Sequence, residues 1–87
     1  MAGKKLICGN WKLNYGVAET KAVLGAMAAE ASSFESLDLA VAPVATLLST
    51  ASEVLRGSAL HLAAQNVHHQ DKGAFTGEWA CHHLNEW

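Results

Sequence analysis

At 87 residues the chain is long enough for one small domain. Hydrophobic residues make up 51% of it and charged residues 16%, which is more apolar than so small a domain can easily cover, so we expect exposed apolar surface or missing sequence. Six Lys and Arg against eight Asp and Glu give a net charge of −2 without a basic stripe, which argues against a nucleic-acid partner.

The sequence predicts no membrane segment and no export signal. The longest uncharged stretch, residues 39–52, contains Pro43 and several hydroxyl side chains and is too short to span a bilayer. The apolar run after the two lysines near the start is too short for the core of a signal peptide. Because secretory features are lacking, Cys8 and Cys81 are expected to be reduced thiols. We therefore expect a cytoplasmic protein without a membrane partner.

The first part of the chain predicts a strand, a helix and a second strand. Residues 5–8 form a short apolar run that ends at Gly9. Apolar residues then recur at helical spacing until two serines end the pattern. Residues 37–42 are again apolar and stop at Pro43, because proline lacks the backbone donor that a strand would use. The apolar face of the helix consists of Val17, Leu24, Met27, Ala28 and Ala31.

The next part predicts a second helix and a third strand. Apolar residues repeat at helical spacing over residues 47–55, with Thr46 as the expected cap and Gly57 beyond the last turn. Residues 60–64 form a third apolar run without clean alternation, the pattern of a strand buried on both faces. The order β-α-β-α-β favours an α/β fold with parallel strands and right-handed crossovers. Periodicity alone is compatible with both a barrel and an open doubly wound sheet.

A long irregular segment follows the third strand. Residues 66–78 have neither a helical nor a strand period, and loops of this length are usually functional or disordered. Residues 79–87 resume a weakly helical pattern. No repeat or linker divides the chain, so residues 1–87 are expected to be a single domain or part of one.

Polar side chains follow the first and third predicted strands. Asn10 and Lys12 come just after the first, and Gln65 and Asn66 leave the third at the same edge of the sheet, where parallel α/β folds collect their ligands. A lysine there offers a compact cation to a phosphate or a developing oxyanion, and an asparagine offers a donor and an acceptor. Such a site would suit a small phosphorylated carbonyl compound. On placement alone, a lysine in such a loop is more often a solvated surface charge.

Two segments add a family resemblance to this placement. Gly9-Asn10-Trp11-Lys12-Leu13-Asn14 is similar to G-N-W-K-M-N, a motif of the triosephosphate isomerase family, with Leu13 in place of Met. Ala64-Gln65-Asn66-Val67-His68-His69-Gln70-Asp71-Lys72-Gly73-Ala74-Phe75-Thr76-Gly77-Glu78 resembles the segment after the third strand in the same family. Residues 39–43 and the helix after them resemble the family's second strand and helix.

The resemblance implies a particular fold and reaction. Residues 1–87 would be the N-terminal β-α-β-α-β(-α) portion of a (β/α)8 TIM barrel, with the third helix cut short. Such a barrel takes about 250 residues, so the chain is expected to be an incomplete part of one. The implied reaction is the interconversion of dihydroxyacetone phosphate and glyceraldehyde 3-phosphate in glycolysis and gluconeogenesis, with no metal and no organic cofactor.

By the same resemblance, particular residues take particular roles. Asn10 would help to orient the substrate, and Lys12 would be a catalytic residue that binds the substrate and neutralises the enediol intermediate. In this family the loop after the third strand reaches into a neighbouring subunit, which implies a homodimer. Gln65, Thr76 and Glu78 would belong to this dimer loop, with Thr76 supporting the Asn10 and Lys12 of the other subunit.

The chain also departs from the family pattern. In this family, a well-known example of pKa tuning, a glutamate base and a neutral histidine transfer the proton, and both lie in segments after the third helix. Glu78 belongs to the loop motif and is not that base, so the chain alone is expected to be inactive. Tyr15 stands where the family often has Gly, and Val44 where it often has a second proline. Residues 79–83 are an unfamiliar start to the third helix.

Two other readings of the residues remain. Imidazole and thiolate groups near the end of the chain suit zinc, but adjacent histidines point in different directions and no C-x₂-C pair accompanies them, so no metal is expected. Alternatively, open sheet edges would make a non-catalytic, self-associating interaction module. The side chains in the zinc reading are His68, His69, Cys81, His82 and His83.

Overall fold

The computed structural model describes residues 3–87 and contains one parallel sheet. Its strands are β1 (Lys5–Asn10), β2 (Leu37–Ala42) and β3 (Leu60–Leu62), in the order β1-β2-β3. Ile7 pairs with Leu39, which in turn pairs with Leu60. The predicted succession of parallel strands is therefore confirmed.

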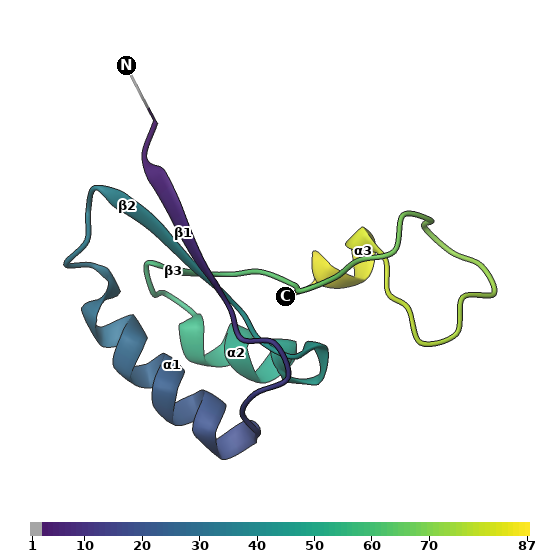
Figure 1. Cartoon of the computed structure of the whole chain (residues 1–87), viewed down its shortest axis with the longest axis horizontal. Helices are drawn as coiled ribbons and strands as arrows, with labels where there is room; N and C mark the ends of the chain where they lie inside the picture. The colour runs from purple at the N-terminus through teal and green to yellow at the C-terminus, as the bar shows by residue number, and fades with distance from the viewer. Residues whose placement is uncertain (1–2) are drawn as a thin grey trace.

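Two helices connect the strands and lie on the same side of the sheet (Figure 1). The helix α1 (Val17–Ala31) joins β1 to β2, and α2 (Leu48–Leu55) joins β2 to β3 after a short 3-10 helix η1 (Ala45–Leu47). Strands in sequential order with both crossovers on one face are the arrangement of a barrel, because an open doubly wound sheet reverses its strand order and covers both faces. The observed β-α-β-α-β arrangement agrees with the predicted N-terminal part of a (β/α)8 barrel.

The core lies between the sheet and these helices. Side chains alternate across a strand, so Leu39 and Val41 of β2 face the same side as Leu60 and Leu62 of β3. Leu24 and Ala51 are fully buried against this side. The buried cluster consists of Leu24, Ala31, Val41, Ala51, Leu55 and Leu60.

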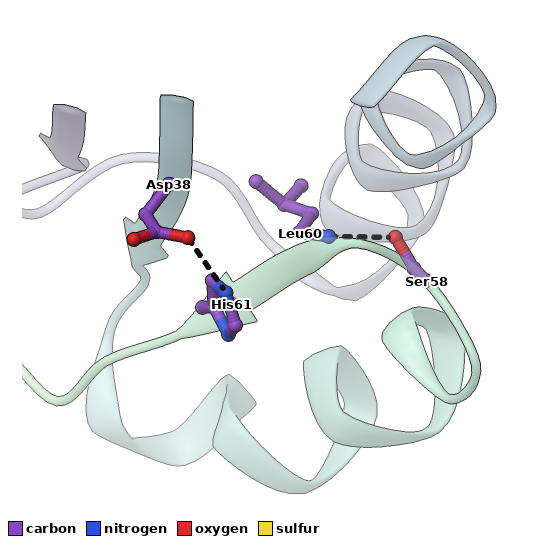
Figure 2. Close-up of polar contacts among 4 residues, drawn as sticks. All are labelled: Asp38, Ser58, Leu60 and His61. Carbon is purple, nitrogen blue, oxygen red and sulfur yellow. Dashed lines mark hydrogen bonds and ion pairs between the residues drawn. The ribbon is translucent and has the colours of Figure 1, made fainter. Parts of the chain in front are cut away.

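The opposite face of the sheet carries polar residues from β2 and β3. The Nε2 atom of His61 lies 3.8 Å from Oδ1 of Asp38 on the neighbouring strand, on the side of the sheet away from the Leu60 side chain (Figure 2). The two side chains are 63% and 45% exposed. A pair so open to solvent contributes at most about 1 kcal/mol to stability.

Apolar surface is exposed, as the composition predicts. All of β1 is exposed because the helices cover only β2 and β3. Leu6 is 64% exposed, and Leu13 in the loop after β1 is 90% exposed. None of the helices among residues 3–87 combines the length and the apolar character needed to cross a bilayer.

The ends of several elements differ from the sequence prediction. The predicted cap Thr46 is wrong, because it lies inside η1, which begins at Ala45, two residues after Pro43. The N-cap of α2 is Leu47, without a side-chain bond. The third strand ends at Leu62 rather than Ala64, because β2 ends before Pro43 and offers no further ladder.

The helical faces differ from the prediction as well. In α1, Leu24 and Ala31 are buried as expected, but Val17 in the first turn and Met27 at the margin of the face are 52% and 38% exposed. The last helix, α3 (Cys81–Leu84), has four residues instead of the expected span 79–87, because the indole of Trp79 bonds to the loop before it.

Thr20 in α1 is fully buried, and its hydroxyl has no hydrogen-bond partner among residues 3–87. Replacing the hydroxyl with a methyl group removes an unsatisfied polar atom of similar size. We therefore expect Thr20→Val to raise the free energy of unfolding by about 1 kcal/mol, measured by urea denaturation of the chain. The exposed Thr76→Val serves as the control and should change it little. A destabilised Thr20→Val chain would contradict the burial of an unpaired hydroxyl.

Candidate functional site

The candidate site lies at the carboxyl ends of the three strands. Asn10 is the last residue of β1, and Lys12 follows two residues later. Ala42 ends β2, and Gln65 comes three residues after the end of β3. The parallel register brings Asn10 beside Ala42. The structure thus places Asn10, Lys12 and Gln65 at one edge of the sheet, where the sequence predicts them.

Local hydrogen bonds fold the loop after β1 tightly. The backbone N–H of Lys12 donates to Oδ1 of Asn10 at 2.8 Å, and the amide of Asn14 donates to the carbonyl of Trp11 at 2.8 Å. The N–H of Trp11 donates to the carbonyl of Ala42 at 3.0 Å, which extends the β1–β2 pairing into the loop. Asparagine side chains commonly stabilise turns in this way.

Two residues of this loop adopt left-handed backbone angles. Lys12 has φ 56° and Tyr15 has φ 72°, in a region that non-glycine residues seldom occupy. The Tyr15 ring packs edge-on against Trp11, with ring centroids 5.0 Å apart. The angle at Tyr15 explains physically why a glycine suits this position, and the contact with Trp11 offsets part of the cost. Beyond the loop, the carboxylate of Glu19 accepts the N–H of Gly16 at 3.2 Å where α1 begins.

Lys12 is suited to binding an anion. Its side chain is exposed, and within residues 3–87 it forms no ion pair. Lysine provides a compact cation on a flexible stem, which can reach a phosphate or an oxyanion. Asn10 uses its side-chain oxygen as the acceptor in this turn, and its amide nitrogen donates no hydrogen bond among residues 3–87.

Gln65 contacts Lys12 within the same chain. Its Nε2 atom donates to the carbonyl oxygen of Lys12 at 2.8 Å and to that of Ala42 at 2.8 Å. Sequence reasoning placed Gln65 at the correct edge of the sheet but missed these bonds, since no local pattern links residues that lie 53 positions apart.

The other two residues assigned to the dimer loop lie elsewhere. The segment 66–80 projects away from the sheet (Figure 1). Thr76 and Glu78 are exposed in it, and within residues 3–87 no hydrogen bond joins their side chains to Asn10 or Lys12. A single chain therefore brings Asn10, Lys12 and Gln65 together but leaves Thr76 and Glu78 apart from them.

The loop is closed at its base and packed at its centre. The N–H of His68 donates to the carbonyl of Trp79 at 2.8 Å, and the indole of Trp79 donates to the carbonyl of Asn66 at 2.7 Å. The His68 ring lies 4.1 Å from the Phe75 ring and 4.5 Å from the His69 ring, between centroids. The pocket inside the loop, about 70 Å³, is much smaller than a typical ligand pocket of about 300 Å³ or more.

The histidines of this region do not form a metal centre in the structure. Among residues 3–87, no three His, Cys, Asp or Glu side chains are grouped so that they could hold a metal ion. Nδ1 of His68 accepts the N–H of Gln70 at 3.0 Å, and Nδ1 of His83 accepts the N–H of Ala80 at 2.9 Å. These nitrogens serve backbone structure. Cys8 and Cys81 are free and exposed.

Comparison with known proteins agrees with this architecture. The sequential parallel strands and the helices on one face are those of the class of (β/α)8-barrel proteins. Within that class, the family model described as triosephosphate isomerase matches residues 5–87. The chain therefore belongs to the triosephosphate isomerase family.

Similar proteins include bacterial relatives and a solved structure. Triosephosphate isomerase of Herpetosiphon aurantiacus is 42% identical over 83 residues, covering 95% of this chain and 33% of the relative. That of Chlorobium chlorochromatii is 45% identical over 76 residues, covering 86% and 30%. The crystal structure of triosephosphate isomerase from Bartonella henselae superposes with a TM-score of 0.86 at 36% identity, over 95% of this chain and 34% of that one. The chain spans about a third of the length of the relatives it matches.

Gly73 is a sensitive point of the projecting loop. It has φ 142°, and a Cβ atom there would lie 2.7 Å from Cε2 of Phe75. We expect Gly73→Ala to displace the Phe75 ring from His68, which would change the ring-proton chemical shifts of Phe75 in NMR spectra. Gly25→Ala, whose Cβ would meet nothing within 4 Å, should leave these shifts unchanged. Identical Phe75 shifts in both variants would contradict the packing described for the loop.

Proposed function

We propose that residues 5–87 supply the first part of a triosephosphate isomerase, which interconverts dihydroxyacetone phosphate and glyceraldehyde 3-phosphate in the cytoplasm. The observation that carries the proposal is Lys12, exposed and held by Asn10 at the carboxyl ends of parallel strands. Membership of the triosephosphate isomerase family supports the choice of substrate.

The proposed roles follow from chemistry and placement. The Lys12 ammonium would neutralise negative charge that develops on the substrate oxygen when a proton leaves the neighbouring carbon, and such stabilisation is commonly a large part of catalysis. The amide of Asn10 would donate a hydrogen bond that orients the substrate. The proton-accepting base and the phosphate-binding amides would come from the remaining two thirds that the relatives possess.

A second element of the proposal is a homodimer. Residues 71–78 are all exposed, and Phe75 at 44% exposure offers apolar surface on a segment that stands clear of the sheet. A loop of this kind, closed at its base by Trp79, is suited to insertion into another subunit. Thr76 and Glu78 would then approach the site of the other subunit, and Gln65 would lie at the root of the loop.

The lysine can be tested in a chimeric barrel that joins residues 1–87 to the remaining two thirds of the Herpetosiphon aurantiacus relative. We expect this chimera to isomerise the two triose phosphates and Lys12→Met to lower kcat by about 10²- to 10³-fold. Lys21→Met, which removes an exposed lysine of α1, is the matched control and should leave the rate unchanged. The isolated 87-residue chain should be inactive, because the base is supplied by the rest of the barrel. A folded chimera that works equally well with Lys12→Met would refute the proposed role.

The dimer can be tested in the same chimera by analytical ultracentrifugation. We expect a mass of two chains for the parent protein and of one chain for Thr76→Arg, because a long cation at the loop would obstruct docking and cost free energy to desolvate. Ser33→Arg, at an exposed serine between α1 and the start of β2 on the opposite edge of the sheet, should leave the dimer intact. A parent chimera that sediments as a monomer at all concentrations would rule out the dimer.

A further inference from the structure

Gln65 bridges two strand ends through one side chain. Its amide nitrogen donates to the carbonyl of Ala42, the last residue of β2, and to the carbonyl of Lys12 in the loop after β1, both at 2.8 Å. Gln65 itself follows β3. One side chain thus joins the segments that leave all three strands.

The chemistry of the two partners fixes the orientation of this amide. Both are carbonyl oxygens, which only accept hydrogen bonds, and the –NH₂ group of glutamine has two hydrogens to give. If the amide of Gln65 were turned over, its side-chain oxygen would face these two carbonyl oxygens, and no hydrogen bond could form. The carbonyl of Ala42 accepts a second bond from the N–H of Trp11 at 3.0 Å, which uses both of its lone pairs.

The backbone of Lys12 requires such support. A left-handed conformation is unfavourable for a residue other than glycine and persists only where the surroundings enforce it. At Lys12, with φ 56°, the N–H is held by Asn10 and the C=O by Gln65. Both backbone polar groups of this residue are therefore anchored, one within its own loop and one from across the sheet.

We propose that Gln65 is a positioning residue for Lys12: its amide holds the Lys12 backbone in the left-handed conformation and so aims the ammonium group at the substrate. The inference rests on the proposed function of Lys12, and it gives Gln65 a role inside its own subunit besides any contact with a second one. It predicts that a side chain of equal length without donors leaves the fold intact but frees the Lys12 backbone.

The conformational part is tested by NMR on the 87-residue chain. A left-handed residue gives a strong intraresidue contact between its amide and α protons, and we expect this signal for Lys12 in the parent chain and its loss in Gln65→Met. Gln70→Met is the matched control: Gln70 is also exposed, and within residues 3–87 its side chain makes no hydrogen bond. The Gln70→Met chain should preserve the left-handed signal of Lys12. A parent chain without the left-handed signal, or a Gln65→Met chain that keeps it, overturns the proposal.

The functional part is tested by the kinetics of the chimeric barrel. We expect Gln65→Met to lower kcat and raise KM together, with kcat/KM falling about 10- to 10²-fold, because a displaced ammonium weakens both binding and catalysis. A merely structural defect would reduce the amount of active enzyme and lower the apparent kcat with KM unchanged. That result, or kinetics equal to those of Gln70→Met, overturns the positioning role.

The two proposals fail in different ways. If Lys12 has no part in catalysis, Lys12→Met leaves the chimera active, whatever happens at Gln65. If Lys12 is catalytic but Gln65 does not position it, Lys12→Met lowers kcat as expected, while Gln65→Met retains both the parent KM and the left-handed NMR signal.

Discussion

The carbonyl oxygen of Ala42 is the point on which the arrangement of the strand ends depends. It accepts hydrogen bonds from Trp11, in the loop after β1, and from Gln65, after β3. Because Pro43 follows and has no N–H to continue the ladder, β2 ends there and its last carbonyl is left available to its neighbours. Without this shared acceptor, Trp11 would lose its hydrogen bond to β2, and Gln65 would keep only its bond to the carbonyl of Lys12.

The position of the proposed site follows from the sheet. Parallel strands in register end at the same edge, so Asn10 and Ala42 are neighbours through backbone pairing alone. The register depends on the core, because Leu39 and Leu60 reach the helices only in this alignment. The burial of Leu39 and Leu60 against the helices thus determines the position of Lys12 at the carboxyl edge of the sheet.

Much of this organisation can be predicted from the sequence. The alternation of apolar runs and helical periods predicts the element order, and the place of Asn10 and Lys12 after a strand predicts their common edge. Periodicity cannot distinguish a barrel from a doubly wound sheet, because the choice depends on which face the second helix covers.

The errors and omissions have physical causes too. Thr46 has the chemistry of a helix cap. However, the short helix η1 that follows Pro43 already begins at Ala45, so Thr46 lies inside it. The α3 helix begins at Cys81 and not at Trp79 because the N–H of Ala80 bonds to Nδ1 of His83 and so caps the helix start. The bond from Gln65 to Lys12 and the left-handed angle of Lys12 arise from the meeting of two distant loops, and neither residue type favours them by itself.

The exposure of β1 has a consequence for the behaviour of the chain in solution. β1 is an edge strand among the described residues, so its outer row of backbone N–H and C=O groups can pair with another chain, and Leu6 and Ile7 add apolar side chains to that edge. Lys4 and Lys5 lie at the start of the same strand, where positive charges oppose the stacking of identical edges. The two positive charges therefore disfavour aggregation through this edge.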